Sequence, residues 1–160
     1  MKIEIAEKQD LKSILDLQKS CYMEEAELYK DFSIPPVTQT LKSIEQDFEN
    51  EFFLKLVLNG NIIGSVRGTL KADTCKIGRL IVDENFRNKG LGKKLMEAIE
   101  HQFKEANRFE LFTGHKSERN LSLYKKLGYS EFRRQKINEK LELVFLEKNN
   151  HKKVTNKTKS

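Results

Sequence analysis

Residues 87–94 combine two glycines with four cations, and they lie between a predicted strand and a predicted helix. The apolar run Leu80-Ile81-Val82 precedes them, and from Leu91 to Ala106 the apolar residues recur with helical spacing. A turn of this kind directs successive backbone N–H groups into one concavity at the positive end of a helix, where an anion can bind. The segment therefore predicts a strand, a glycine-rich turn and a helix, in that order.

The glycines and cations of this turn favour a polyphosphate ligand. Gly90 and Gly92 can adopt a positive φ or lie against a phosphate where a Cβ would collide. A turn that uses glycine only for its geometry and lysine only for solubility is the simpler alternative. The side chains that raise the local positive potential are Arg87, Lys89, Lys93 and Lys94.

Three other phosphate-binding motifs fit the turn less well. A dinucleotide fingerprint requires a third glycine at position 95, where Leu95 stands. A P-loop requires glycine at position 87 and serine or threonine at position 94, but these residues are Arg87 and Lys94. A glycine-flanked hairpin that binds nucleic-acid phosphates needs a helix before the turn, whereas residues 80–82 are predicted to be a strand.

The remaining segments predict a mixed α/β (α+β) sheet with helices on both faces. Asn59-Gly60 supplies the positive-φ pair of a tight hairpin between apolar strands at 52–58 and 62–70. Ser117 is predicted to cap a helix, and Gly128 fits the left-handed position just past the end of that helix. The other predicted elements are strands at 3–5, 75–82, 109–113 and 141–146, helices at 11–21 and 41–48, and an acidic loop at 22–37.

Length and composition indicate one domain. With 160 residues, 38% of them hydrophobic, the chain can build a single core. We expect this domain at residues 1–148 and a basic, flexible tail at 149–160, which carries much of the net charge of +6. No apolar run resembles a signal peptide or reaches the ~20 residues of a membrane span, so we expect a cytoplasmic protein. Cys21 and Cys75 lack metal-ligand spacing, and no metal is expected.

Two segments resemble the GNAT superfamily of acyltransferases. Residues 80–96 are similar to its acetyl-coenzyme A signature, whose core (Arg/Gln)-x-x-Gly-x-(Gly/Ala) matches Arg87, Gly90 and Gly92. Residues 120–129 are similar to the family's penultimate helix, which ends in Leu-Tyr-x-x-x-Gly-(Phe/Tyr). The order of the predicted elements over residues 1–147 is also the order found in the family.

The resemblance implies a GNAT-like mixed central sheet of about 6–7 strands, flanked by about four helices and splayed between its fourth and fifth strands. It also implies acetyl-CoA as the cosubstrate, with the pantetheine arm in the splay and the pyrophosphate on residues 87–92. The implied coenzyme-binding residues are Leu80, Ile81, Val82, Arg87, Asn88, Lys89, Gly90, Leu91, Gly92, Lys93 and Asn120.

Tyr124 takes, by the same resemblance, the position of the general acid that protonates the leaving thiolate. A core tyrosine on an amphipathic helix is the alternative. The family often has an asparagine seven residues before this tyrosine, where this chain has Ser117. Asn120 lies four residues before Tyr124, which is one helical turn, so both side chains share a face and Asn120 can still reach the coenzyme.

The implied reaction is transfer of an acetyl group to a primary amine, by direct attack of the amine on the thioester. A backbone N–H near Ile81 or Val82 would stabilise the oxyanion. Spacing marks no residue as the base, and each candidate also has a simpler explanation as a solvated surface group. The candidates for the base or for acceptor binding are Glu24, Glu25 and Glu27 in the acidic loop and His115 after the fifth strand.

The acceptor implied by this reaction is a small-molecule amine or a protein amine, and the acidic loop favours a cationic one. Two other functions are compatible with the same residues. The protein could be a non-catalytic sensor that binds acyl-CoA, although the retained Tyr124 argues against this. It could also bind nucleic acid through the basic turn and tail, although no aromatic residues alternate with the cations. A homodimer could form by pairing of the strand at 141–146, and no membrane contact is expected.

Overall fold

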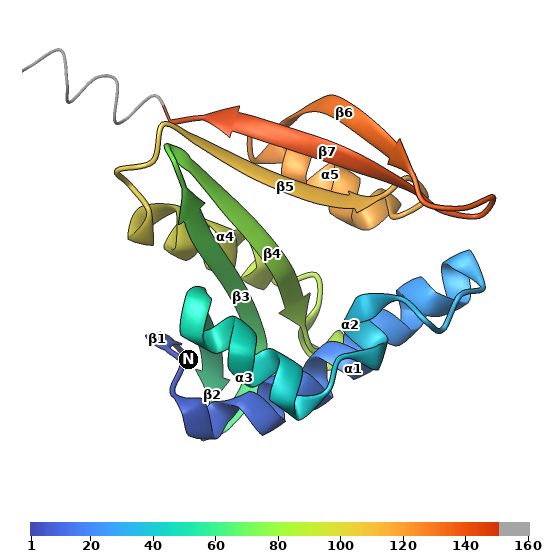
Figure 1. Ribbon diagram of the computed structural model, residues 1–160. Helices are drawn as coiled ribbons and strands as arrows, with labels where there is room; N and C mark the ends of the chain where they lie inside the picture. Colours follow the sequence, from blue (N-terminus) through green and yellow to red (C-terminus); the bar gives the residue numbers. More distant parts are fainter. Residues whose placement is uncertain (151–160) are drawn as a thin grey trace, which may run out of the picture.

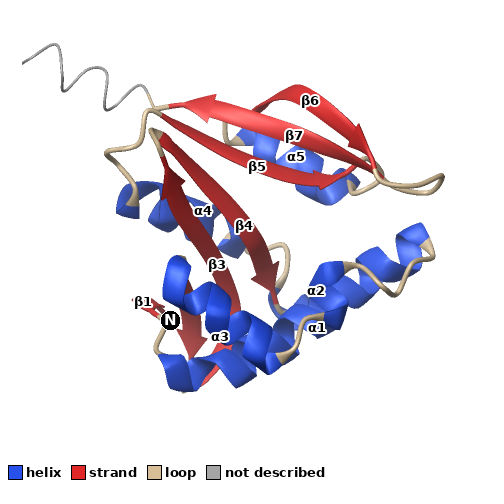
Figure 2. Ribbon diagram, in the orientation of Figure 1, coloured by secondary structure: helices blue, strands red, loops and turns tan. Residues whose placement is uncertain are grey.

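The computed structural model describes residues 1–150, which form a seven-stranded sheet with helices on both faces (Figures 1 and 2). The sheet order is β1-β2-β3-β4-β5-β7-β6. The strands are β1 (Lys2–Ile5), β2 (Phe52–Leu58), β3 (Asn61–Lys71), β4 (Thr74–Val82), β5 (Arg108–Gly114), β6 (Ser130–Lys136) and β7 (Glu142–Asn149). The helices are α1 (Leu11–Tyr29), α2 (Pro35–Thr38), α3 (Leu41–Asn50), α4 (Leu91–Gln102) and α5 (Glu118–Lys126), with short 3-10 turns η1 (Lys8–Asp10) and η2 (Glu84–Phe86).

The predicted mixed α/β fold is confirmed. All neighbouring strands are antiparallel except β4 and β5, which are parallel. The predicted hairpin between β2 and β3 turns at Asn59 and Gly60, whose φ angles are 50° and 80°. Gly128 follows α5 with a φ of 97°, as its predicted left-handed position requires. No helix in the described residues is long and apolar enough to cross a membrane.

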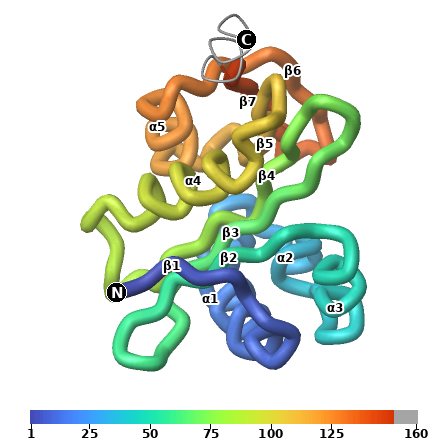
Figure 3. Tube along the Cα trace, turned by 90° about the vertical axis from the view of Figure 1, so that its left-hand side faces the viewer, coloured from blue at the N-terminus to red at the C-terminus, as the bar shows by residue number. Residues whose placement is uncertain are grey.

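Each face of the sheet has its own core. Successive residues of a strand point to opposite faces, so Phe53 packs with Ile14 of α1 and Ile44 of α3, while its neighbour Leu54 enters the larger core on the other face. That larger core includes residues of α4 and α5, such as Leu95. Figure 3 shows the strands running between these two sets of helices.

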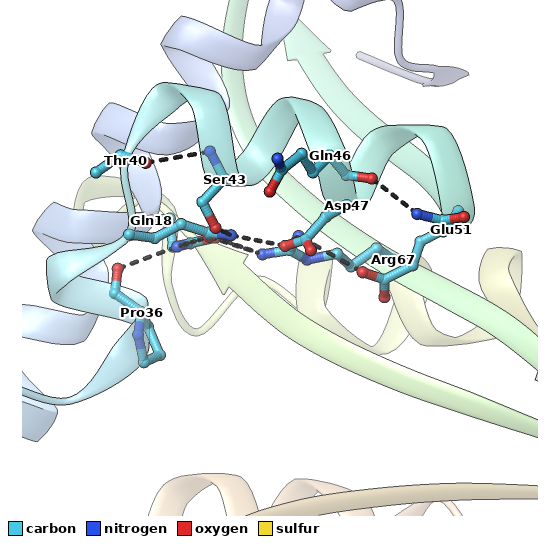
Figure 4. Close-up of polar contacts among 10 residues, drawn as sticks. Gln18, Pro36, Thr40, Ser43, Gln46, Asp47, Glu51 and Arg67 are labelled. Carbon is cyan, nitrogen blue, oxygen red and sulfur yellow. Dashed lines mark hydrogen bonds and ion pairs between the residues drawn. The ribbon is translucent and has the colours of Figure 1, made fainter.

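A buried arginine joins three helical segments to the sheet (Figure 4). Arg67 of β3 is 2% exposed, and its guanidinium donates to Asp47 Oδ2 of α3 at 2.8 Å and to Gln18 Oε1 of α1 at 2.9 Å. Gln39, which follows α2, accepts from the same guanidinium at 3.3 Å. Gln18 also donates to the carbonyl of Pro36 in α2 at 3.0 Å. These contacts fix α1 against the sheet.

The predicted acidic loop at 22–37 is wrong in its first half. Helix α1 continues through Tyr29 and ends at Lys30, which has a left-handed φ of 51°. Ala26 and Tyr29 are buried and Tyr22 is half-buried, so these positions form a helical stripe against the core. Glutamate itself has a high helix propensity. The acidic side chains are therefore held on a helix instead of a loop.

The C-terminal strand lies inside the sheet. Strand β7 pairs with β5 on one side and with β6 on the other. Both edges of this strand are therefore already paired, so the homodimer considered above could not form by adding a second copy to it unless β5 or β6 were displaced. Strand β7 ends at Asn149, and Asn150 donates to the carbonyls of Lys104 at 2.7 Å and Ala106 at 2.8 Å. The rest of the predicted tail, residues 151–160, lies outside the described residues.

Candidate active site

Strands β4 and β5 are paired only at one end. Their parallel ladder joins Thr74–Lys76 to Arg108–Glu110. Beyond this ladder β4 continues to Val82 and β5 to Gly114 without pairing to each other, and Figure 1 shows the two halves of the sheet diverging from that end. The predicted splay between the fourth and fifth strands is confirmed. It leaves the backbone of β4 free of β5 where a ligand could pair with it.

Two cavities adjoin at the splay. The first has a volume of about 440 Å³ and lies between β4, α1, α5 and the N-terminal end of α4. The second has a volume of about 430 Å³ and lies between β4, β5, α1 and the segments before α2 and β7. Tyr22, Glu25, Leu80 and Asn120 line both cavities. Both volumes fall in the range of roughly 300–1,000 Å³ that small-molecule sites occupy, so two ligands can meet here.

Every residue predicted to bind the coenzyme lines the first cavity except Lys89, whose ammonium lies 5.6 Å from the ring centroid of Phe86. The turn before α4 contains two left-handed residues, Asn88 with a φ of 63° and Gly90 with a φ of 73°. The first hydrogen bond into α4 runs from the Lys94 N–H to the Gly90 carbonyl. The N–H groups of residues 91–93 have no acceptor within the helix, and they form an anion-binding end at this cavity.

The two glycines of the turn serve different purposes. A Cβ on Gly90 would meet no protein atom within 4 Å, so within the chain it is the positive φ that favours glycine at this position. A Cβ on Gly92 would lie 3.3 Å from Leu123 Cδ2, so Gly92 allows α4 to pack closely on α5. Of the two roles predicted for these glycines, the positive φ is found at Gly90, and close packing of α4 on α5 is a further reason for glycine at position 92.

Glu24 lies with the cations of the first cavity. Arg87 Nη1 donates to both of its carboxylate oxygens, at 2.8 and 3.0 Å, and Arg119 Nη1 lies 3.8 Å from Glu24 Oε2. Glu24 does not line the second cavity. An anion that enters the first cavity would therefore compete with Glu24 for these two guanidinium groups.

Glu25 is oriented by a chain of hydrogen bonds. Ser117 Oγ donates to Glu25 Oε2 at 2.5 Å and lies 2.9 Å from Tyr29 Oη. Since the single hydroxyl hydrogen of Ser117 goes to Glu25, Tyr29 is the donor in the second contact, and Tyr29 Oη in turn accepts from the Lys116 N–H at 2.9 Å. A Cβ on Gly114 would collide with the Tyr29 hydroxyl. Ser117 occupies the N-cap position but its side chain makes no capping bond, so its predicted capping role is wrong.

The two other predicted acceptor-side residues lie away from the cavities. Glu27 is exposed on α1, and neither it nor His115 lines the first or the second cavity. His115 Nδ1 accepts from the backbone N–H of Glu142 at 3.0 Å, and its ring lies 5.7 Å from the ring of Tyr29. That backbone contact holds the His115 imidazole beside the start of β7.

Tyr124 and Asn120 share one face of α5, as their spacing predicts. Both line the second cavity, and Asn120 Nδ2 donates to Thr113 Oγ1 at 3.3 Å. Tyr124 is 6% exposed, and burial raises the pKa of its phenol well above the ordinary value. Among the described residues its hydroxyl has no hydrogen-bond partner. Tyr124 is therefore a protonated donor available to a ligand at the splay.

Strand β4 contains an irregularity that the sequence did not reveal. Its register against β3 shifts between the pairs Ser65–Ile81 and Arg67–Gly78, which places one extra residue in β4 opposite Val66. Arg79 has a φ of 50° at this bulge, and neither Arg79 nor Leu80 has a partner in the β3 ladder. Bulges occur often beside active sites, because they redirect side chains and end the pairing of a strand. No sequence pattern around residue 79 marks it.

A model of the acetyltransferase (GNAT) family matches residues 11–129. The chain belongs to the GNAT acetyltransferase family. This membership supports acetyl-CoA-dependent acetyl transfer as the general activity, and the first cavity coincides with the residues of the family's coenzyme signature.

Solved structures share the fold of this GNAT chain. It superposes on smu.2055 from Streptococcus mutans UA159 with a TM-score of 0.81, at 19% identity, covering 94% of this chain and 99% of the other. It superposes on the PaiA N-acetyltransferase of Thermoplasma acidophilum, a complex with coenzyme A, with a TM-score of 0.76, at 16% identity, covering 93% and 99%. The protein UPF0157 YqkA of Bacillus subtilis (strain 168) is 26% identical over 120 residues. That match covers 75% of this chain but only 34% of YqkA, so the chain spans about a third of that relative.

Proposed function

We propose that this GNAT protein is an N-acetyltransferase that transfers the acetyl group of acetyl-CoA to a primary amine, by direct attack of the amine on the thioester. The observation that carries the proposal is the junction of two cavities at the splay. The first cavity has an anion-binding helix end, and the second has a carboxylate and a phenol. Small-molecule amines and protein amines are both open as acceptors.

Residues of the first cavity fit the coenzyme. The N–H groups at the start of α4 and the side chains of Arg87 and Lys93 would hold the pyrophosphate. The unpaired side of Leu80–Val82 would bind the pantetheine arm through its backbone, and Asn120 lies where the two cavities meet. A backbone N–H near Ile81 or Val82 would stabilise the oxyanion that forms on the thioester carbonyl.

Tyr124 would act on the leaving thiolate mainly by donating a hydrogen bond. Reference pKa values of about 10 for a phenol and 8.5 for a thiol make complete proton transfer unfavourable by roughly 2 kcal/mol. Burial raises the pKa of Tyr124 further, which increases that difference and keeps the phenol protonated. A protonated phenol beside the sulfur still stabilises the developing negative charge.

Glu25 is the group we assign to the proton that the amine loses. A primary amine with a pKa of about 10.4 is neutral in roughly one molecule in 2,500 at pH 7, which costs about 4.6 kcal/mol. Of the four candidates, Glu25 alone lines the second cavity, and Ser117 orients its carboxylate. Glu24 pairs with Arg87, and Glu27 and His115 lie outside both cavities.

Calorimetry with acetyl-CoA, coenzyme A and a DNA duplex tests the coenzyme half of the proposal. We expect both coenzyme forms to bind and the duplex not to bind. Gly90→Asp should abolish coenzyme binding, because it adds a negative charge at a position with a φ of 73°. Failure of the wild-type protein to bind acetyl-CoA would overturn the proposal.

A thiol-release assay across polyamines, amino acids, aminoglycosides and peptide N-termini tests the catalytic half. Turnover with at least one class of amine supports an enzyme. Coenzyme binding without any turnover would instead indicate an acyl-CoA sensor. Tyr124→Phe should lower turnover while largely preserving coenzyme affinity, since Tyr124 lines only the second cavity.

A further inference from the structure

Arg79 lines the second cavity, and no carboxylate among residues 1–150 forms an ion pair with it. Its guanidinium makes no hydrogen bond and no ion pair with residues 1–150. Its Nε is also the one buried side-chain nitrogen or oxygen atom in that part of the chain without a partner. Buried polar atoms in folded proteins nearly always have a partner, so an exception points to a group supplied from outside.

Other arginines that the structure describes as buried or half-buried have carboxylate partners. Arg67 pairs with Asp47, Arg87 with Glu24, and Arg108 with Glu110. The charge of Arg79 acts on Glu51, which lies 3.9 Å from Arg67, and Glu25 of the same cavity accepts from Ser117, so both carboxylates have other partners. The chain thus satisfies its other enclosed guanidinium groups internally and leaves this one to a ligand.

The position of Arg79 assigns it to the acceptor and not to the coenzyme. Arg79 lines the second cavity and is absent from the walls of the first. The bulge at residue 79, with its left-handed φ of 50°, displaces it from the regular alternation of β4. Its charge favours the ionised form of Tyr22, and it lies close enough to Arg67 to disfavour the charged form of that arginine. The charge of Arg79 also opposes the burial that raises the pKa of Glu51, so two arginines lie near this one glutamate.

The second cavity also contains negative charge. Glu25 of α1 lines the same cavity, as does Asp31 beyond the end of that helix. Apolar side chains also line this cavity, among them Phe112, which is 51% exposed, and Leu141. The second cavity thus offers a carboxylate, a guanidinium and an apolar surface to one small molecule.

We propose that Arg79 binds a carboxylate of the acceptor, so that the acceptor is an amino acid with an apolar side chain. This inference rests on the proposed acetyltransferase function and names the substrate class of the same site. Glu25 receives the amino group, and the planar guanidinium of Arg79 donates to both carboxylate oxygens. The acidic segment alone favoured a cationic acceptor, and Arg79 changes this to a molecule with one charge of each sign.

Three amines with the same phenyl group separate the charges: phenylalanine, phenylalaninamide and phenethylamine. We expect the wild-type kcat/KM for phenylalanine to exceed the values for phenylalaninamide and phenethylamine by at least about 30-fold. The two weaker substrates lack the carboxylate, and loss of one partner of an enclosed charge pair has an effect of this size. Arg79→Gln should remove this preference chiefly by raising KM for phenylalanine, and Arg79→Lys should retain part of the preference. Arg134→Gln, which removes a guanidinium paired on β6, is the control and should keep the wild-type ratio.

Binding of the corresponding products gives a second readout that does not require turnover. Calorimetry on the protein loaded with coenzyme A should show tighter binding of N-acetylphenylalanine than of N-acetylphenylalaninamide, and Arg79→Gln should remove the difference. The inference would be overturned if the wild type showed no preference for the carboxylate, or if Arg79→Gln showed the same preference as the wild type. Either outcome would leave acetyl transfer to amines intact. Coenzyme binding with no amine turnover would overturn the proposed function instead. The product titration would still test whether Arg79 binds a carboxylate.

Discussion

Replacing Glu25 with glutamine removes the carboxylate that we assign as proton acceptor while changing little else. Glutamine has the same size, and its side-chain oxygen can still accept the hydrogen bond that Ser117 Oγ donates at 2.5 Å. The chain from Lys116 through Tyr29 to Ser117 can therefore stay intact. The fold and the shapes of both cavities should be preserved, so a change in rate reports on the lost base.

The size of the effect follows from the chemistry of the amine. A positioned general base contributes about 10²–10⁴-fold in rate, which corresponds to roughly 3–5 kcal/mol in the barrier. This is comparable to the ~4.6 kcal/mol needed to deprotonate a free amine at pH 7. The defect of Glu25→Gln should therefore shrink as the pH rises toward the pKa of the amine, because more of the acceptor is already neutral.

Steady-state thiol release at several pH values measures this effect, and calorimetry measures acetyl-CoA affinity separately. Glu27→Gln is a matched control, since it makes the same change two residues further along α1 at an exposed position outside both cavities. We expect Glu27→Gln to behave as the wild type and Glu25→Gln to bind acetyl-CoA with reduced turnover. Equal turnover in the two variants at pH 7 would refute the assignment of Glu25.

Three further predictions concern Tyr124, Arg67 and Cys75. Because burial raises the pKa of Tyr124, its phenol stays protonated through about pH 10. Turnover should therefore rise with pH as the amine loses its proton. A decrease in turnover below about pH 10 would contradict the donor role of Tyr124. Arg67→Met strands the carboxylate of Asp47, and breaking a buried pair costs about 3–5 kcal/mol. The lower end applies, since Asp47 keeps 35% of its side chain exposed, and thermal unfolding should show a Tm lower by about 6–12 °C. Burial raises the pKa of Cys75 from 9.0 to about 12, so its stabilising contribution is complete below pH 9 and is lost as the pH rises toward 12. The free energy of unfolding measured in urea should therefore fall between pH 9 and 12, and it should fall less steeply with pH in Cys75→Ala. Equal dependence on pH in the two proteins would exclude Cys75 as the source.

The sequence by itself determined the features that depend on local backbone geometry and on periodicity. Asn59 and Gly60, and likewise Gly90 and Gly128, adopt the positive φ that their turns predict, because few residues tolerate that conformation. The order of strands and helices follows from apolar spacing. The family signature at 80–96 then indicated the splayed sheet and the coenzyme, and its residues line one cavity apart from Lys89.

Tertiary structure decided what each acidic and basic side chain faces. Glu24, Glu25 and Glu27 are near neighbours on one helix, but Glu24 pairs with Arg87, 63 positions away, and Glu25 with Ser117, 92 positions away, while Glu27 is exposed. Such contacts exist only after α1, α4 and α5 pack around the splay, so spacing along the chain cannot assign them. The same reason applies to Arg79, which forms no ion pair within residues 1–150, because this is a property of the folded cavity and not of the residues beside it in sequence.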